Sequence, residues 1–171
     1  IGLAYQAKPI KSILDHGTGR GGLVKKINER FHPKIVAEGY DPGTKEFSKK
    51  PQKKFDIVTS IDVLEHIGRE NLDATLSEIK QFTGQFFFFC IDLLPASKTV
   101  PDGRNAHFLI APPEWWAQQL KIHFPIVTCI EVGRTPKGDR YPMHLFGCAT
   151  SSMIFFDPMN EFIKGVQLAN R

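Results

Sequence analysis

Hydrophobic positions along the first part of the chain switch between short strand-like runs and one helical stripe. The run at residues 11–15 ends in a glycine-rich turn at residues 17–22, and apolar side chains then recur at helical spacing as far as Phe31. Residues 34–41 form a second strand-like run, which Pro42 and the following glycine close. This order predicts a strand, a tight turn, a helix and a second strand.

The middle of the chain continues the alternation. The polar stretch 42–54 carries five lysines and predicts a loop, whereas residues 55–61 predict a buried strand. An apolar stripe made by Leu72, Leu76, Ile79 and Phe82 predicts a helix that ends at Gly84. The run Phe86–Ile91 is so apolar that we expect a central strand of a parallel sheet.

A short helical turn is also expected directly after the strand at residues 55–61. Asp62 is a plausible cap for this turn, which contains Leu64, Glu65 and His66.

The last third of the chain predicts a loop, a helix and a hairpin. We expect a long loop over 92–111, a helix over 112–120, strands over 126–132 and 145–149 joined by residues 133–143, and a short helix near 161–166. Together these elements predict one doubly wound α/β domain over residues 1–171, mostly parallel with a C-terminal antiparallel hairpin. Since the first residue is Ile rather than Met, we expect that N-terminal residues could be missing.

Composition narrows the class of protein. Hydrophobic residues make up 42% and charged residues 23% of the chain, as in globular domains. The three cysteines, Cys90, Cys129 and Cys148, show no paired or metal-ligand spacing, which argues against a disulfide scaffold and a zinc site. No apolar stretch approaches the ~20 residues of a membrane helix, and no signal peptide begins the sequence. We therefore expect a cytoplasmic protein without a membrane partner.

The net charge is small. Lys and Arg number 22 against 18 Asp and Glu, which gives +4 and does not by itself indicate a nucleic-acid partner. The lysines of residues 45–54 could contact phosphates, but such a run in a polar loop is more often a solvated face.

The glycine turn and the acidic residue after the second strand suggest a nucleotide-like ligand. Gly17, Gly19 and Gly21 allow a tight turn whose amides approach a ligand, and Asp41 can accept hydrogen bonds from two ribose hydroxyls. A dinucleotide is an alternative, because the same turn satisfies GxGxxG with Gly22. Asp15 favours a cationic cofactor without phosphate over a pyrophosphate, and S-adenosylmethionine (SAM) fits that description.

Three motifs in order resemble class I SAM-dependent methyltransferases of the type 11/type 12 group. The segment 15–21 (DHGTGRG) is similar to their DxGxGxG motif, and Gly39-Tyr-Asp41 to their ribose-binding position. The segment 55–67 (FDIVTSIDVLEHI) is similar to their fourth-strand signature. The resemblance covers roughly residues 10–132 and implies a Rossmann-like fold and methyl transfer from SAM.

The resemblance also implies roles for single residues. It places Asp15 and Gly17 near the methionine amino and carboxylate groups, Thr18, Gly19 and Gly21 in the turn beneath the cofactor, Asp41 on the ribose, and Ser60, Ile61 and Asp62 beside the methionine portion. His66 faces the substrate in some relatives and packs structurally in others.

The chain departs from the family pattern between Asp41 and Phe55. This segment is too short for the usual helix, third strand and helix, and it contains no counterpart of the acidic residue that usually holds the adenine amino group. We therefore expect the third strand to be shortened or absent. The adenine pocket would then be partly open, or closed by the lysine-rich loop or by a partner subunit in a homodimer.

Acceptor-side residues are expected in the loop over 102–107. Arg104 and His107 could bind an acceptor and remove its proton there, with His66 as a second candidate base. Alternatively, this loop is a purely structural turn whose polar side chains form hydrogen bonds with the nearby backbone. Trp115 and Trp116 either line the same mouth or divide between core and surface.

A divalent metal is a further alternative at this end. Asp62, Glu65 and His66 have a spacing that resembles half of the metal site of small-RNA 2′-O-methyltransferases, and His107 could join them. Because the same VLEH sequence is common in metal-free relatives, we expect no metal.

The sequence therefore predicts a SAM-dependent methyltransferase with a small or soluble acceptor. Two alternatives stay open: an NAD(P)-dependent oxidoreductase of similar fold, and a degenerate SAM-binding or scaffold protein.

Overall fold

A computed structural model describes residues 9–133, 143–152 and 156–169. Within them, six strands form one sheet in the order β2-β1-β3-β4-β6-β5. The strands are β1 (Ser12–His16), β2 (Val36–Tyr40), β3 (Phe55–Ile61), β4 (Thr83–Asp92), β5 (Ile126–Val132) and β6 (His144–Thr150). The first four strands pair in parallel, whereas β6 is antiparallel to both β4 and β5. The predicted doubly wound fold is confirmed.

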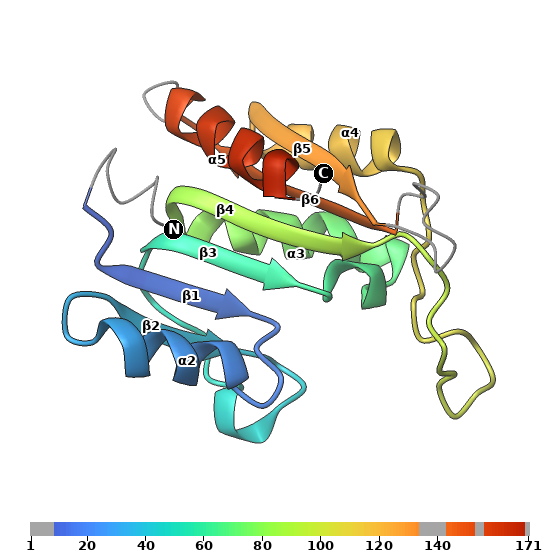
Figure 1. The fold of residues 1–171 in the computed structure, drawn as a ribbon. Coiled ribbons are helices and arrows are strands. Elements are labelled where there is room, and N and C mark those ends of the chain that lie inside the picture. Colours follow the sequence, from blue (N-terminus) through green and yellow to red (C-terminus); the bar gives the residue numbers. More distant parts are fainter. Residues whose placement is uncertain (1–8, 134–142, 153–155, 170–171) are drawn as a thin grey trace.

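Within the described part of the chain, four α-helices cover the sheet. They are α2 (Gly22–Phe31), α3 (Arg69–Phe82), α4 (Pro113–His123) and α5 (Phe156–Ala169). Figure 1 shows α2 and α5 on one face and α3 and α4 on the other. Of the described helices, none combines the length and apolar character needed to cross a bilayer.

The run of phenylalanines in β4 shows how the sequence builds these two layers. Successive side chains of a strand point to opposite faces. Phe86 and Phe88 accordingly pack in the core beneath α2 and α5, and Phe87 and Phe89 in the core beneath α3 and α4. The strand is thus buried on both faces, as expected from its composition. It is parallel to only one neighbour, however, because β6 returns between β4 and β5.

The predicted role of Gly84 in ending the third helix is wrong. The helix α3 ends at Phe82, where Thr83 Oγ1 donates a hydrogen bond to the carbonyl of Ile79 at 2.7 Å, and Gly84 already lies in β4. A Cβ at Gly84 would lie 2.7 Å from the carbonyl oxygen of Phe55. The glycine therefore allows two strands to approach closely and does not end the helix.

The segment between β2 and β3 is a loop with one short 3₁₀ helix, Lys45–Phe47. The sheet of the described residues places β2 at its edge, so the third strand expected to be shortened or absent is not there. The remaining elements lie close to their predicted places, although α5 is longer than expected. The polar segment between β5 and β6 falls partly on residues 134–142, outside the described residues, and so do residues 1–8.

Candidate functional site

The glycine turn lies at the carboxyl end of β1, directly beside the end of β2. Gly17, Gly19 and Gly21 have φ values of 78°, 53° and 73°, a region that suits glycine and strains other residues. The N–H of Gly17 donates to the carbonyl of Tyr40 at 2.8 Å, and the N–H of Gly21 donates to the carbonyl of Thr18 at 2.9 Å. The tight glycine turn predicted from the sequence is therefore present.

Asp41 is held by two backbone amides. Its Oδ2 accepts a hydrogen bond from the N–H of Gly19 at 2.9 Å, and its Oδ1 accepts one from the N–H of Gly43 at 2.8 Å. The carboxylate is therefore fixed against the turn, in the place where a ligand on the turn would meet it.

A cleft of about 310 Å³ opens at this point. Its lining includes Gly17 and Asp41 from the turn and from β2, and Asp62 and His66 from the segment after β3. It also includes His16 and Glu78. The structure thus brings three separate predicted motifs to one cleft at the carboxyl edge of the sheet, as expected for this fold.

Three predicted cofactor residues lie below this surface. Asp15 is buried, and Thr59 Oγ1 donates a hydrogen bond to its Oδ1 at 2.8 Å. Burial raises the pKa of Asp15, and the Thr59 hydrogen bond opposes this effect. Ser60 is fully buried and Thr18 is nearly so. None of the three is among the residues that line the cleft, so their contact with a cofactor stays a prediction.

Ile61 and Asp62 are exposed at the end of β3. The turn that follows is the expected short helix, Leu64–His66, but no side-chain cap begins it. Asp62 instead has a left-handed backbone with φ 53°, and its N–H donates to the carbonyl of Cys90 at 3.0 Å. The predicted capping role is therefore wrong, because Val63 and not Asp62 precedes the helix.

The cleft contains a contact between His16 and Glu78 that was not predicted from the sequence. His16 is buried, and its Nε2 lies 3.3 Å from Glu78 Oε1. Lys50 forms an ion pair with the other oxygen of Glu78. Burial lowers the pKa of His16, and Glu78 opposes this effect. Glu78 belongs to the polar face of α3, 62 residues from His16, so no local spacing could have indicated the pair.

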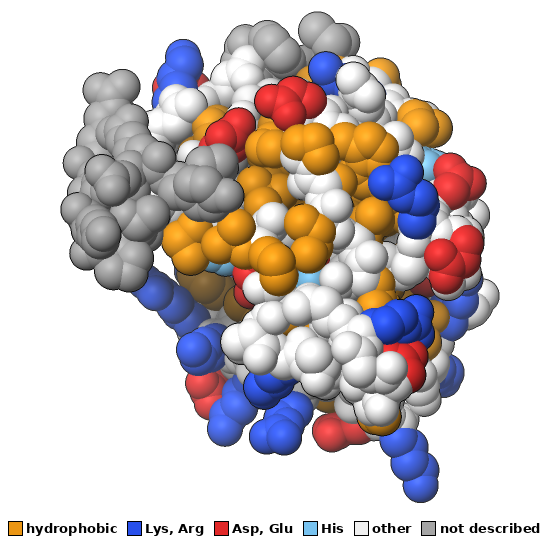
Figure 2. Space-filling view, turned by 90° about the vertical axis from the view of Figure 1, so that its right-hand side faces the viewer, with side chains coloured by type: hydrophobic (Ala, Val, Ile, Leu, Met, Phe, Trp, Pro, Cys, Tyr) orange, Lys and Arg blue, Asp and Glu red, His pale blue; other side chains and the backbone are white. Residues whose placement is uncertain are grey.

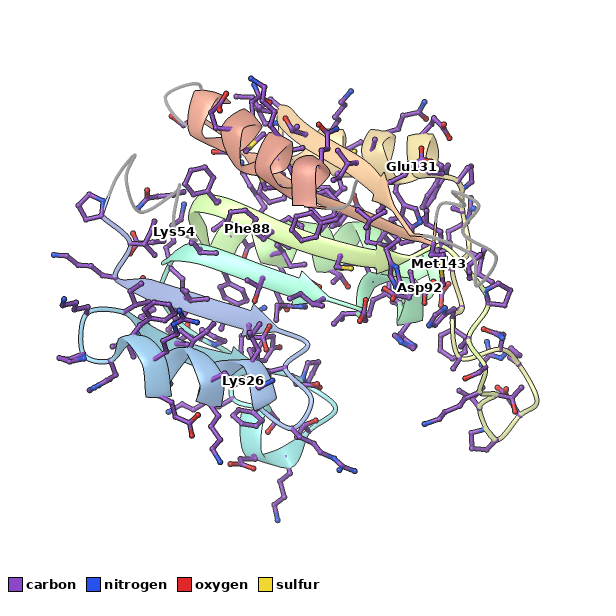
Figure 3. The ribbon with its side chains drawn as sticks, viewed as in Figure 1. Lys26, Lys54, Phe88, Asp92, Glu131 and Met143 are labelled. Atoms are coloured by element: carbon purple, nitrogen blue, oxygen red, sulfur yellow. The ribbon has the colours of Figure 1, made fainter. Side chains whose placement is uncertain are left out.

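The loop after β4 lies at the same edge of the sheet. It leaves β4 at Asp92, which Figure 3 labels near Met143, and Figure 1 shows it extending away from the strand ends. Asp102 engages Arg104 twice, with Oδ2 at 2.9 Å from Nε and 2.7 Å from Nη2. The guanidinium also lies 4.9 Å from the centre of the Phe108 ring. Arg104 is therefore held in place as a hydrogen-bond donor, although Asp102 Oδ2 already takes up part of its guanidinium group.

A second cleft of about 440 Å³ adjoins the first. Arg69, Arg104 and Phe108 are among its lining residues, and His66 lines both clefts. Figure 2 shows hydrophobic side chains gathered on this face of the molecule. Ile61, Phe108 and Ile110 are exposed at this end of the sheet. Arg104 thus faces the second cleft and not the one at the glycine turn.

The two tryptophans divide between core and surface. Trp116 is fully buried in the core beneath α3 and α4, so it lines no mouth. Trp115 is half-buried, and the guanidinium of Arg69 lies 4.8 Å from the centre of its ring.

Similarity to known proteins agrees with this geometry. Residues 3–128 match a family described as a methyltransferase domain. No curated protein matches the sequence.

Solved structures with the same fold share little sequence. An O-methyltransferase family protein from Burkholderia thailandensis is 13% identical with a TM-score of 0.63, over 89% of this chain and 53% of that one. A Listeria monocytogenes protein, described as an S-adenosylmethionine-dependent methyltransferase, is 13% identical with a TM-score of 0.59, over 88% of this chain and 99% of that one. DhpI in complex with SAH is 14% identical with a TM-score of 0.55, over 86% of this chain and 81% of that one.

The chain spans about half the length of the Burkholderia protein and nearly all of the Listeria protein. Nothing among these similarities supports the oxidoreductase alternative. The family match spans the glycine turn, Asp41 and the segment after β3. The chain therefore belongs to the methyltransferase domain family.

Proposed function

We propose that this chain binds SAM in the cleft beside the glycine turn and transfers its methyl group to a small or soluble acceptor. The observation that carries the proposal is the fixed contact between Asp41 and the amide of Gly19 within a family match that includes both. A carboxylate fixed there can accept hydrogen bonds from ribose hydroxyls without further ordering.

The charge of the cleft supports a cationic cofactor. Its lining includes the carboxylates Asp41 and Asp62, and also Glu78, whose charge is partly balanced by its ion pair with Lys50. The sulfonium and ammonium groups of SAM are attracted by these side chains, whereas a pyrophosphate would be repelled by them. The charge of the cleft therefore disfavours a nicotinamide dinucleotide.

The acceptor would approach from the second cleft, because His66 lines both. SAM is intrinsically reactive, so the main task of the protein is to align the acceptor atom with the methyl group. His66 or His107 would remove a proton where the acceptor carries one, and Arg104 would hold an acidic or polar group of the acceptor.

Because β2 is the edge strand of the sheet, the adenine side would be open there. We propose that the loop 42–54 or a second subunit covers it. Lys50 is tied to Glu78 and Lys53 to Glu38 by ion pairs, which attach this loop to the body of the domain.

Isothermal titration with SAM, S-adenosylhomocysteine and NAD tests the proposal. We expect the first two to bind and NAD not to bind. Equal or tighter binding of NAD would overturn the assignment of the cofactor. If SAM binds while no acceptor among small metabolites, sugars and RNA is methylated, the alternative of a SAM-binding scaffold gains support.

A further inference from the structure

Glu65, His66 and His107 come together between the two clefts. One carboxylate oxygen of Glu65 and one ring nitrogen of each histidine lie within 4.8 Å of one another. The two imidazole rings meet edge to face, with their centres 4.8 Å apart. Asp62, the fourth member of the metal alternative considered from the sequence, does not belong to this cluster.

Glu65 has an unmet need for a partner. Its side chain is fully buried, and its Oε1 accepts a hydrogen bond from the N–H of Asp92 at 3.0 Å. Its Oε2 is also buried but has no hydrogen-bond partner among the described residues. A buried unpaired oxygen is costly, so it points to a ligand that supplies the missing contact.

The two histidines are already oriented as metal ligands. The Nδ1 of His66 lies 2.8 Å from the carbonyl oxygen of Ala106, and the Nδ1 of His107 lies 2.6 Å from that of Leu94. A carbonyl oxygen only accepts, so Nδ1 must carry the proton in both rings. In the neutral rings the lone pair is then on Nε2, which is the nitrogen left for a metal. Backbone carbonyls commonly fix the ring of a metal-bound histidine in this way.

We propose that Glu65, His66 and His107 form a binding site for a divalent transition-metal ion. Two imidazoles and one carboxylate suit ions of the Zn²⁺ and Co²⁺ type, whereas Mg²⁺ and Ca²⁺ favour oxygen ligands. This departs from the expectation of no metal, because neither the paired carbonyls nor the unpaired Glu65 oxygen can be read from VLEH alone.

Binding of a metal ion would require only a small movement of the three side chains. Ligand bonds of about 2.1 Å in a tetrahedral site place ligand atoms about 3.4 Å apart, which is closer than the present upper limit. Glu65 is buried and His107 is half-buried, while His66 is exposed, so a small shift of its ring brings it closer to them. Three protein ligands leave one coordination position open, as in catalytic rather than structural sites. Because His66 lines both clefts, that position would be accessible to an oxygen of an acceptor. With the ion bound, the Nε2 lone pairs of His66 and His107 are both used, so neither histidine would then act as the base.

Cobalt binding tests this inference without any measurement of methyl transfer. Chelator-treated protein without a histidine tag is titrated with Co²⁺, and visible absorption is followed, since Co²⁺ in a site of low coordination number absorbs more strongly than the hydrated ion. Zn²⁺ should displace it, and Mg²⁺ should not. The readout is independent of SAM, so its failure and the failure of the proposed function are distinguishable.

Substitutions of the proposed ligands test whether the ion binds at this cluster. We expect Glu65→Gln and His107→Asn to weaken Co²⁺ binding by roughly 100-fold or more, because loss of even an outer partner costs 10–100-fold. His123→Gln is the matched control, since His123 pairs with Asp73 at 3.0 Å away from the cluster, and it should bind as the unaltered protein does. His107→Asn keeps the test valid if the buried Glu65 variant fails to fold. A spectrum equal to hydrated Co²⁺, or equal binding by the folded His107→Asn variant, would overturn the proposal.

Discussion

Asp41 Oδ2 accepts a hydrogen bond from the backbone N–H of Gly19 at 2.9 Å, which joins the end of β2 to the turn that follows β1. Two residues 22 apart in sequence thereby share one ligand-facing corner. The bond orders the turn before any ligand arrives. Binding energy is then not spent on ordering the loop.

Substitution of Asp41 should therefore weaken SAM binding. We expect Asp41→Ala to reduce the binding free energy by roughly 1–3 kcal/mol, through loss of charge-assisted hydrogen bonds to the ribose. Isothermal titration measures it. Asp73→Ala, a change of an exposed acid on α3, should leave the affinity unchanged.

Asp41→Asn separates the contact of this residue with the glycine turn from the effect of its charge on the ribose. The amide oxygen can still accept from the N–H of Gly19, whereas the NH₂ group cannot accept from the N–H of Gly43. The contact with the turn is therefore kept while the charge is lost. We expect an affinity between those of the unaltered protein and Asp41→Ala. Unchanged affinity in folded Asp41→Ala would mean that Asp41 does not contact the cofactor.

Strand packing gives a prediction about stability. A Cβ at residue 84 would lie 2.7 Å from a backbone oxygen of β3, which cannot rotate away, so Gly84→Ala should destabilise the fold by about 1–3 kcal/mol. A Cβ at Gly22, at the start of α2, meets nothing within 4 Å, and Gly22→Ala should change stability by about 1 kcal/mol or less. Urea unfolding of the two variants checks this, and equal stability would refute the packing argument.

The fold was predictable to the extent that its signals are local. The strand at residues 55–61 and the stripe of α3 follow from periodicity within a few residues. The place of β6 between β4 and β5 depends on pairing between distant segments, and no local pattern reports it. The wrong prediction for Gly84 has the same cause. A glycine that ends a helix and a glycine packed against a neighbouring strand look alike in sequence.

The candidate site divides in the same way. Gly17 and Asp41 stand in a recognisable motif, and the structure places both at the cleft. The partners of His16 and His107 are a carboxylate on α3 and a carbonyl at Leu94, which only the folded chain brings near. Arg104 was predicted as an open donor, but its hold on Asp102 is also local and could have been read from a spacing of two residues.

The His16 side chain should make stability depend on pH. Burial lowers its pKa in the folded state, so below about pH 6.5 the unfolded chain binds a proton that the folded chain resists. The contribution of His16 to the free energy of unfolding is therefore complete above about pH 6.5. It decreases as the pH falls from there toward the folded pKa, by at most about 1.4 kcal/mol per pH unit.

Urea unfolding of the protein and of His16→Gln at about pH 7.5 and about pH 5 measures this contribution. The variant should lose less stability than the unaltered protein between the two conditions. Each protein at the higher pH is its own reference, so a general cost of the substitution cancels. Parallel losses would show that His16 titrates alike in both states.

The Arg104 fork leads to a prediction on the acceptor side. Its guanidinium is held by Asp102 and by the Phe108 ring, and it lines the cleft adjoining that of the glycine turn. A guanidinium ordered in this way can bind a carboxylate or phosphate on the acceptor. We expect Arg104→Ala to lower methyl transfer by tenfold or more, about 1.4 kcal/mol of transition-state stabilisation, with SAM affinity nearly unchanged.

Two further variants make the test specific, once a screen of small metabolites, sugars and RNA has found an acceptor. Lys98→Ala removes an exposed charge from the same loop and should transfer methyl groups at the normal rate. Arg104→Lys keeps the charge but loses the planar fork, so it should recover little of the activity if two parallel hydrogen bonds hold the acceptor. Full recovery would indicate a simple charge effect. A normal rate in Arg104→Ala would make the loop a structural turn, and the acceptor would then have to bind near His66 and Trp115.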